Sequence, residues 1–584
     1  MSPEKNRSGR WLPDSVKLSR PIPFASGLRS ALRDGYGWSN LRADVLAGLV
    51  VGIVALPLSM ALAIASGVPP QYGLYTAIVA GCVIALAGGS RLNVSGPTAA
   101  FVVLLAPISA KYGVGGLAVA SLMAGGVLVM MGLARLGRLI QFVPYPVTTG
   151  FTAGIAVVIA TLQVKDFLGL EVAGNGEHYW NRIANLWSAL PSLHWQDALV
   201  GAVTLALLIL WPKITKKVPG PLVAILAGTL LAVGMNVWFD SDIATIGSRF
   251  SYLLDGEVRN GIPQLPPIPL LPWSLPGPDG QPLGLSWQLI TDLAGPALAV
   301  AALGAIESLL AAVVADGMAG TKHDPDAELV GQGLGNLIAP FFGGFAATGA
   351  IARTATSVRS GGRSPIAPVV HSIFVLIAVL ALAPALSYLP MASMGALLLI
   401  VAWNMSDFRH FIHTLRVAPR SDVAVLLACF GLTVMFDMVI AVGVGIVMAA
   451  LLFMRRMAEI SGSRLVAEGG TSQRGDMPPG VMLYEIAGPL FFGAAGKAVG
   501  GISASGGTQV LILDMHDVPA MDVTGLVALE SLLNRMKSAG TMVHVVGLQP
   551  QPRALLLKAG ITATSALDFF PSVEEAVSAI RSEA

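Results

Sequence analysis

The stretch GGFAATGAIARTATSVRSGG, residues 343–362, lies inside the hydrophobic bulk of the chain but is a poor membrane helix. It is short, rich in Gly, Ala and Thr, and carries Arg353 near its middle. A charge at bilayer depth costs at least about 2.5 kcal/mol, and more where nothing relieves it. An arginine at this position therefore needs a structural or functional reason.

The composition indicates a polytopic membrane protein with a smaller polar part. The 584 residues are 54% hydrophobic and 12% charged, whereas soluble domains carry about 25% charged residues. The two cysteines, Cys82 and Cys429, lie in apolar runs and predict no disulfide framework. The sequence has no Walker A, HExxH, nucleophile-elbow or basic aromatic motif. We therefore expect no enzymatic activity, no cofactor, no metal ion and no nucleic-acid partner.

Apolar runs long enough to cross a membrane, or nearly so, recur from about residue 46 to 457. Two shorter segments rich in small residues, 95–110 and 346–360, complete a count of seven plus seven. An odd number of spans in each half predicts two inverted repeats, 46–240 and 289–457, because the second half then enters from the opposite side.

The charged residues predict the orientation. With the N-terminal segment 1–45 on the inside, the inside loops collect 14 Lys and Arg residues and the outside loops five, as the positive-inside rule requires. We expect both termini in the cytoplasm of a bacterial inner membrane protein. After residue 457 the sequence predicts a polar linker, 458–480, and a cytoplasmic α/β domain, 481–584, from alternating strand and helix patterns.

The two short segments begin alike, with a small-residue lead-in before a helix. NVSGPTAAF, residues 93–101, opens with Ser95, Gly96 and Pro97, and proline suits the first turn because its missing N–H would be unpaired there. Two such helix N-termini meeting near the midplane would attract an anion, and Arg353 would add a full positive charge. The alternative is a pair of packing helices with a structural arginine.

Two further membrane segments carry candidate functional groups. Glu307 is the only acid in residues 298–314, and desolvation favours its protonated form, which suits a proton-coupling site. The alternative is a carboxylate permanently paired with an arginine or with backbone groups. Ser59 lies near the mid-span Pro57, on a stripe of small residues formed by Ala55, Ser59, Ala63 and Ser66, which suits close approach of either a ligand or a neighbouring helix.

Other polar residues in apolar runs favour structural roles. Glu328, Gln332 and Asn336 follow one another at i, i+4 and i+8, so they share one helix face. We expect Glu328 at the inner interface, and interhelical hydrogen bonds from the two amides. His371, alone at the start of an apolar span, is expected at the membrane interface.

Several stretches resemble the SulP anion transporters: LPLSMALAIASGVPPQYGLYTAIVAG, GGSRLNVSGPTAAFVV, GAIESLLAAVVADGMAGTKH, ELVGQGLGN and LILDMHDVPAMDVTGL. The resemblance implies a seven-plus-seven fold with core and gate domains, in which the third and tenth helices are half-helices. It implies an anion site between their N-termini, closed on one side by the first helix. The substrate-binding residues so implied are Arg353, Ala352, Thr354, Ser95, Gly96, Pro97, Thr98 and Ser59, and Glu307 is implied in proton or cation coupling.

The C-terminal domain resembles a STAS domain. In related domains an Asp-Ser-Ser-Gly loop is phosphorylated on its first serine, whereas here Val523 stands at that position and Thr524 is a weak substitute. The resemblance also implies a homodimer, and a cytoplasmic protein is a further possible partner of this domain.

The sequence therefore predicts a secondary active transporter that works by elevator-like alternating access. Its motifs are most similar to the aerobic C4-dicarboxylate transporters of enteric bacteria, which implies proton-coupled uptake of succinate, fumarate or aspartate. The alternatives are a transporter of an inorganic anion (sulfate, bicarbonate or chloride), a membrane-anchored STAS signalling scaffold, and a channel.

Overall fold

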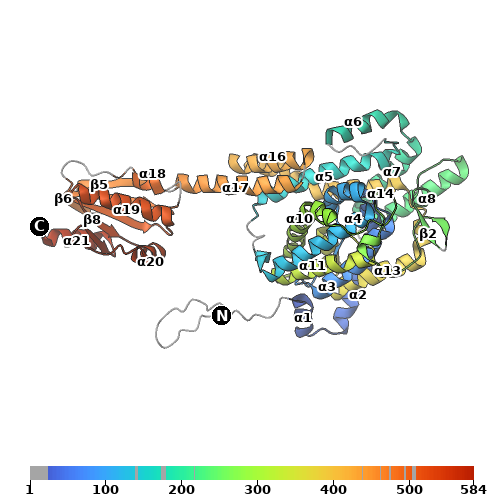
Figure 1. The fold of residues 1–584 in the computed structure, drawn as a ribbon, viewed down its shortest axis with the longest axis horizontal. Coiled ribbons are helices and arrows are strands. Elements are labelled where there is room, and N and C mark those ends of the chain that lie inside the picture. Colours follow the sequence, from blue (N-terminus) through green and yellow to red (C-terminus); the bar gives the residue numbers. More distant parts are fainter. Residues whose placement is uncertain are drawn as a thin grey trace. The chain divides into compact units, whose positions relative to one another are not determined.

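The computed structural model describes residues 24–583 except 139–142, 173–178, 216–217, 255, 437, 461, 473–474, 492–494, 501 and 503–507. The first 23 residues of the expected N-terminal segment therefore lie outside the described part. The chain divides into two compact units, Met1–Gly445 and Ile446–Ala584 (Figure 1).

The first half of the membrane domain consists of helices joined by short connections. Its helices are α1 (Ser26–Arg33), α2 (Trp38–Ala65), α3 (Pro70–Ala87), α4 (Ala99–Leu133), α5 (Tyr145–Leu168), α6 (Tyr179–Ala189), α7 (Trp195–Ile214) and α8 (Gly220–Phe239). The connection to the second half holds α9 (Ile246–Arg249) and a hairpin of β2 (Ser251–Leu254) and β3 (Glu257–Asn260).

Helix α4 contains two predicted segments in one element, because Gly113 breaks it with a φ of 68°. An ideal Cβ at Gly113 would lie 2.5 Å from the carbonyl carbon of Gly277, so the break requires glycine for both conformation and space. The first half-helix therefore runs over 99–112 and a full span over 114–133.

The second half repeats this plan in inverted order across the membrane. Its helices are α10 (Trp287–Ala319), α11 (Pro325–Ile338), α12 (Ile351–Arg359), α13 (Ile366–Leu386), α14 (Met391–Ser406), α15 (Phe408–Val417), α16 (Arg420–Met435) and α17 (Met438–Ile460). With α4 counted as two segments, and without the short helices α1, α6 and α15, each half has seven segments, so the seven-plus-seven prediction is confirmed. Ten of the described helices are long and apolar enough to cross a membrane; α11, α12 and α16 are shorter.

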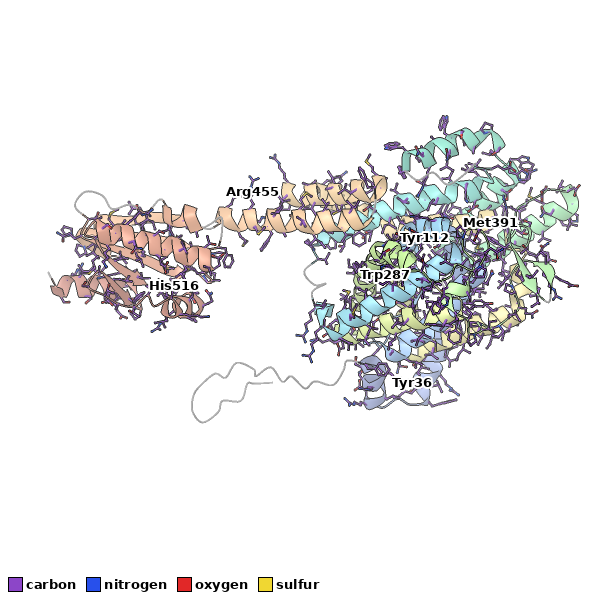
Figure 2. All side chains as sticks on the ribbon, viewed as in Figure 1. Tyr36, Tyr112, Trp287, Met391, Arg455 and His516 are labelled. Atoms are coloured by element: carbon purple, nitrogen blue, oxygen red, sulfur yellow. The ribbon has the colours of Figure 1, made fainter. Side chains whose placement is uncertain are left out.

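The helices pack in two groups that each draw members from both halves. In the core group α13 packs on α2 and α3, α11 on α3 and α4, and α10 on α4. In the gate group α5 packs on α14 and α16, and α7 on α8 and α14. Figure 2 shows the side chains on the ribbon, with Tyr112 at the C-terminal end of the first half-helix and Trp287 at the start of α10. The Tyr112 hydroxyl donates to Asp292 of α10 at 3.3 Å.

The second unit contains a five-stranded sheet in the order β5-β6-β7-β8-β9. Only β5 and β6 pair antiparallel; the other neighbours are parallel. The strands are β5 (Gly462–Ser472), β6 (Gly475–Ala487), β7 (Val510–Asp517), β8 (Met542–Val546) and β9 (Leu567–Phe570). The helices are α18 (Ala495–Gly500), α19 (Val523–Ser538), α20 (Pro550–Lys558) and α21 (Val573–Glu583).

The prediction of a polar linker after residue 457 is wrong. The expected linker, 458–480, contains the end of α17, strand β5 and the start of β6, because the pairing of β5 with β6 overrides its Gly- and Ser-rich composition. The connection between α14 and α16 contains the amphipathic helix α15, whose ten residues are too few to stand out as a period in an otherwise apolar region.

Candidate functional site

The two small-residue lead-ins meet at a two-residue ladder. Strand β1 (Ser95–Gly96) pairs antiparallel with β4 (Thr348–Gly349), so that Ser95 faces Gly349 and Gly96 faces Thr348. Beyond the ladder, α4 begins at Ala99 and α12 at Ile351. The N-termini of two half-helices from opposite repeats are therefore brought together, and their first-turn N–H groups lack helical acceptors.

Arg353 enters this meeting point from α12. Its side chain is 3% exposed, and its Nη2 donates to the Pro97 carbonyl of the other lead-in. Its Nη1 has no hydrogen-bond partner among the described residues and would lie 2.6 Å from an ideal Cβ at Gly96. Glycine at position 96 thus makes room for the guanidinium, and a buried donor without an acceptor marks a place where an anion would be stabilised.

Glu307 of α10 borders the same place. Thr98, the N-cap residue of α4, donates its hydroxyl to Glu307 Oε2 at 2.9 Å. Glu307 and Arg353 interact electrostatically. They are not among the salt bridges of the described residues, in which a nitrogen and a carboxylate oxygen lie within 4.0 Å of each other. Glu307 is also partly exposed, so its carboxyl group is held by one hydroxyl and stays within reach of solvent.

The other predicted residues of the half-helices fall on different sides of the site. Ala352 is exposed although Arg353, its neighbour, is buried. The Thr354 hydroxyl accepts from the Val94 backbone at 2.9 Å and donates to Asn93 Oδ1 at 3.1 Å. The structure therefore gives Thr354 a positioning role for the first lead-in, and its contact with an anion stays a prediction.

Ser59 belongs to α2, which packs against α12. Its residue is fully buried, and its hydroxyl has no hydrogen-bond partner among the described residues. Close packing explains part of the small-residue stripe, since an ideal Cβ at Gly73 would lie 2.1 Å from the Ser59 carbonyl oxygen. The stripe therefore serves helix packing, while the unpaired hydroxyl leaves a ligand contact as a prediction.

One face of α11 supports both lead-ins. The Glu328 carboxylate accepts from the backbone of Gly89 and Ser90, both at 2.9 Å, and from Asn93 Nδ2 at 2.7 Å. Gln332 donates to the Ser95 hydroxyl at 2.8 Å. The face therefore makes hydrogen bonds as predicted, but they join α11 to the first lead-in and not to another helix.

Asn336 completes that face at the second lead-in. Its Nδ2 donates to the Ala347 carbonyl at 2.8 Å, and its Oδ1 accepts from the Ala347 backbone at 2.7 Å. Glu328, Gln332 and Asn336 therefore fix the two lead-ins to one helix, which keeps both half-helix N-termini in register.

Sequence reasoning missed several residues that hold the ladder together. Ser308 hydrogen-bonds Thr348 at 2.7 Å, and its backbone carbonyl accepts from Asn93. These are single polar residues without a period, so their only signal is proximity to Glu307 or to the lead-ins along the chain.

His371, expected at the membrane interface, lies inside the protein rather than on its surface. His371 is fully buried in α13. Its Cε1 lies 3.9 Å from the place of an ideal Cβ at Gly81, and the Ser95 carbonyl oxygen is a neighbour of the same place. The Pro368 carbonyl lies near the ring, but neither ring nitrogen has a hydrogen-bond partner within normal geometry among the described residues. Packing of α13 against α3 covers this part of the helix.

Metal binding finds no support within the described ranges, where no group of three or more His, Cys, Asp or Glu residues is placed to hold an ion. The site thus consists of helix N-termini, one guanidinium, one carboxyl group and hydroxyls. Groups of these kinds are suited to binding an anion and to exchanging a proton; they do not form a nucleophile-and-base arrangement.

The sequence profile of the sulfate permease family matches residues 41–429. The chain belongs to the sulfate permease family. A STAS domain profile matches residues 476–576, which agrees with the sheet and helices of the second unit. The chain is therefore a multi-pass anion transporter with a C-terminal STAS domain, and not an enzyme.

Similar proteins cover the permease almost from end to end. YvdB of Bacillus subtilis, named as a candidate sulfate transporter, is 41% identical over 90% of this chain and 95% of its own length. The bicarbonate transporter BicA of Picosynechococcus is 30% identical over 89% of this chain and 91% of its own. The structure of the murine anion transporter Slc26a9 in the inward-facing state superposes with a TM-score of 0.82 at 19% identity, covering 96% of this chain and 94% of that one.

Proposed function

We propose that this permease is a secondary transporter of a compact inorganic oxyanion such as sulfate or bicarbonate, bound at the ladder of β1 and β4 beside Arg353. The observation that carries the proposal is the unpartnered Nη1 of Arg353, buried where two half-helix N-termini meet. A buried cation with a free donor, aimed at the same point as two positive helix ends, favours a single negative group.

The geometry favours a compact anion over a C4-dicarboxylate. Arg353 is the only Lys or Arg within residues 93–101 and 345–356, which contain both lead-ins and both first turns. A dicarboxylate carries two separated negative groups, and the second would be buried without a cation, which is costly. The printed names of the relatives, sulfate and bicarbonate transporters, support the same choice.

Glu307 is the proposed coupling residue. Its carboxyl group shares the site with Arg353 without pairing to it directly, so protonation would raise the net positive charge next to the anion. Binding of the anion and of a proton would then favour each other. Movement of the core group against the gate group would carry the loaded site across the membrane, with both termini in the cytoplasm and the protein in the bacterial inner membrane as a homodimer.

Uptake into proteoliposomes tests the substrate. The purified protein is reconstituted, and labelled sulfate and labelled bicarbonate are measured in separate arms with unlabelled succinate as a competitor. We expect saturable uptake of at least one inorganic anion and no competition by succinate. Competition by succinate as strong as by the inorganic anion itself would restore the dicarboxylate reading, and uptake that never saturates would indicate a channel.

Two variants with matched controls test the site. Arg353→Ala should abolish anion binding, whereas Arg359→Ala, at the exposed end of the same helix, should keep it. Glu307→Gln should remove the pH dependence of uptake while sparing binding, whereas Glu257→Gln, in the exposed strand β3, should change neither. If Glu307→Gln still accumulates anion from an imposed proton gradient, Glu307 has only a structural role.

A further inference from the structure

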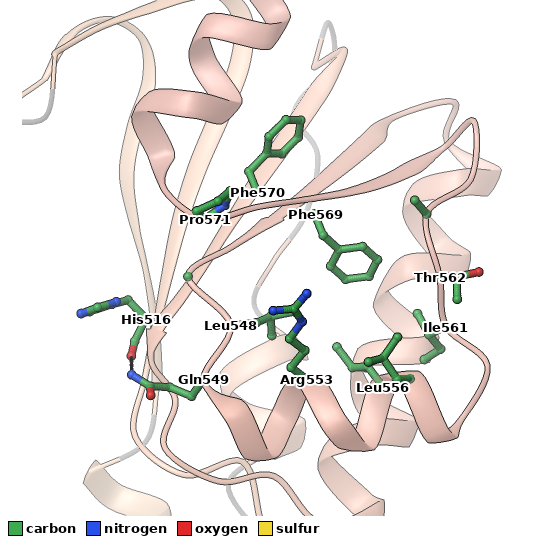
Figure 3. Close-up of a pocket in the computed structure, with 13 residues that line it drawn as sticks. His516, Leu548, Gln549, Arg553, Leu556, Ile561, Thr562, Phe569, Phe570 and Pro571 are labelled. Atoms are coloured by element: carbon green, nitrogen blue, oxygen red, sulfur yellow. Dashed lines mark hydrogen bonds between the residues drawn. The ribbon is translucent and has the colours of Figure 1, made fainter. Parts of the chain in front are cut away.

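The second unit contains a cavity that the transport site does not use. It has a volume of about 580 Å³ and opens beside α20 (Figure 3). His516 near the end of β7, Leu548 just after β8 and Phe569 at the end of β9 all line it. These three strands are parallel, so the cavity lies at their carboxyl ends, where open α/β sheets bind ligands.

The wall of the cavity is largely apolar. Leu548, Leu556, Ile561 and Phe569 supply aliphatic and aromatic surface, and Figure 3 shows Leu556 and the tip of Arg553 pointing from α20 toward the Phe569 ring. A volume between about 300 and 1,000 Å³ with this kind of wall is typical of a site for a small molecule. The wall therefore favours a ligand with an apolar or aromatic body.

The charge of the cavity is positive. Arg553 of α20 lines it and makes no ion pair with a described residue, and no acidic side chain is among the lining residues. The helix end adds little to this attraction, because Pro550 and Pro552 in the first turn of α20 have no N–H to offer. Arg553 is thus the group that would select a negative charge.

Hydrogen bonds hold the cavity in shape without a ligand. Gln549 donates from Nε2 to the His516 carbonyl at 2.9 Å, which is the dashed line of Figure 3. Gln551 forms two hydrogen bonds with the Met521 backbone, each at 2.9 Å. The N-terminal turn of α20 is therefore fixed to the ends of the neighbouring segments, and binding would require little ordering of the protein.

We propose that this cavity binds a small amphipathic anion, with one anionic group held by Arg553 and an apolar or aromatic body against Leu556, Ile561 and Phe569. This cavity is separate from the proposed transport site, whose anion needs no apolar body. It also differs from the loop 522–525, whose first position after the aspartate is Val523.

Ligand-observed NMR on the full-length protein in nanodiscs tests the proposal. The probe is 4-phenylbutyrate, and its neutral amide serves as the charge control. We expect the acid to bind about tenfold or more tightly than the amide, which is the effect of one charge-assisted hydrogen bond. Arg553→Gln should remove that difference, while Lys558→Gln, an exposed charge on the same helix outside the cavity, should preserve it.

A second variant tests the apolar part. Thr562 is exposed and lines the cavity, so Thr562→Trp should fill the space without disturbing the core and should abolish binding of both probes. Equal affinity of the acid for the wild type and for Arg553→Gln would overturn the proposal. Binding that survives Thr562→Trp, or no binding of either probe to the wild type, would also overturn it.

Discussion

Replacing Gly96 with alanine should weaken anion binding while leaving the fold largely intact. The new Cβ would lie 2.6 Å from Arg353 Nη1. Ordinary van der Waals contact begins at 3.4 Å, so the guanidinium must withdraw by about 0.8 Å. Because the tip of a long side chain can move and the ladder backbone cannot, we expect the arginine to leave the position in which its free N–H faces the lead-in.

The size of the effect follows from the interaction that is lost. A hydrogen bond to a charged group contributes about 1.5–3 kcal/mol, which corresponds to roughly ten- to hundredfold in affinity. Stability should fall less, by about 1 kcal/mol. The φ of 159° at Gly96 is close to extended backbone, so alanine should incur only the low end of the energetic cost of an unusual backbone conformation.

The assay compares sulfate affinity in proteoliposomes with thermal unfolding of the same preparations. Gly126→Ala is the matched control, because an ideal Cβ at Gly126, also in α4, meets nothing within 4 Å. In an Arg353→Ala background, Gly96→Ala should have no further effect on stability beyond its backbone cost. A folded Gly96→Ala protein with wild-type affinity would refute the assignment of Nη1 to the anion.

Three further substitutions test the surrounding structure by thermal unfolding. Glu328→Gln should lower stability by about 2–3 kcal/mol, because the buried carboxylate accepts only from N–H donors, whereas Glu257→Gln, which is exposed, should be neutral; equal effects would contradict this. His371→Leu should leave stability unchanged or raise it by about 1 kcal/mol, since it removes buried nitrogens without partners; a large loss would reveal a hidden hydrogen bond. Gly113→Ala should cost at least about 2 kcal/mol, from a positive φ and a close backbone contact, and a neutral result would show that α4 can run straight.

The spans were predictable because the bilayer demands long apolar runs, which can be recognised in the sequence without knowledge of packing. The ends of the elements were not predictable. Helix α2 begins at Trp38, well before the first apolar run, because its polar first turns need no apolar composition.

The candidate site could be predicted in its type but not in its construction. Glycine, proline and an arginine at matching positions of two halves indicated paired half-helices. The ladder between Ser95 and Gly349 joins residues about 250 positions apart, and two residues on each side leave no alternation to detect. The burial of His371 was likewise unpredictable, because it depends on which helix covers the start of α13.

The ladder of β1 and β4 has a consequence for how the protein is made. Each of its residue pairs takes one member from each half of the chain, and the cation stands in the half opposite to the carbonyl that it contacts. Neither half alone contains a finished site. The insertion machinery must therefore thread the two halves through the membrane in opposite senses, and a single threading error in either would leave well-formed helices, an unpaired strand edge and no place for the anion.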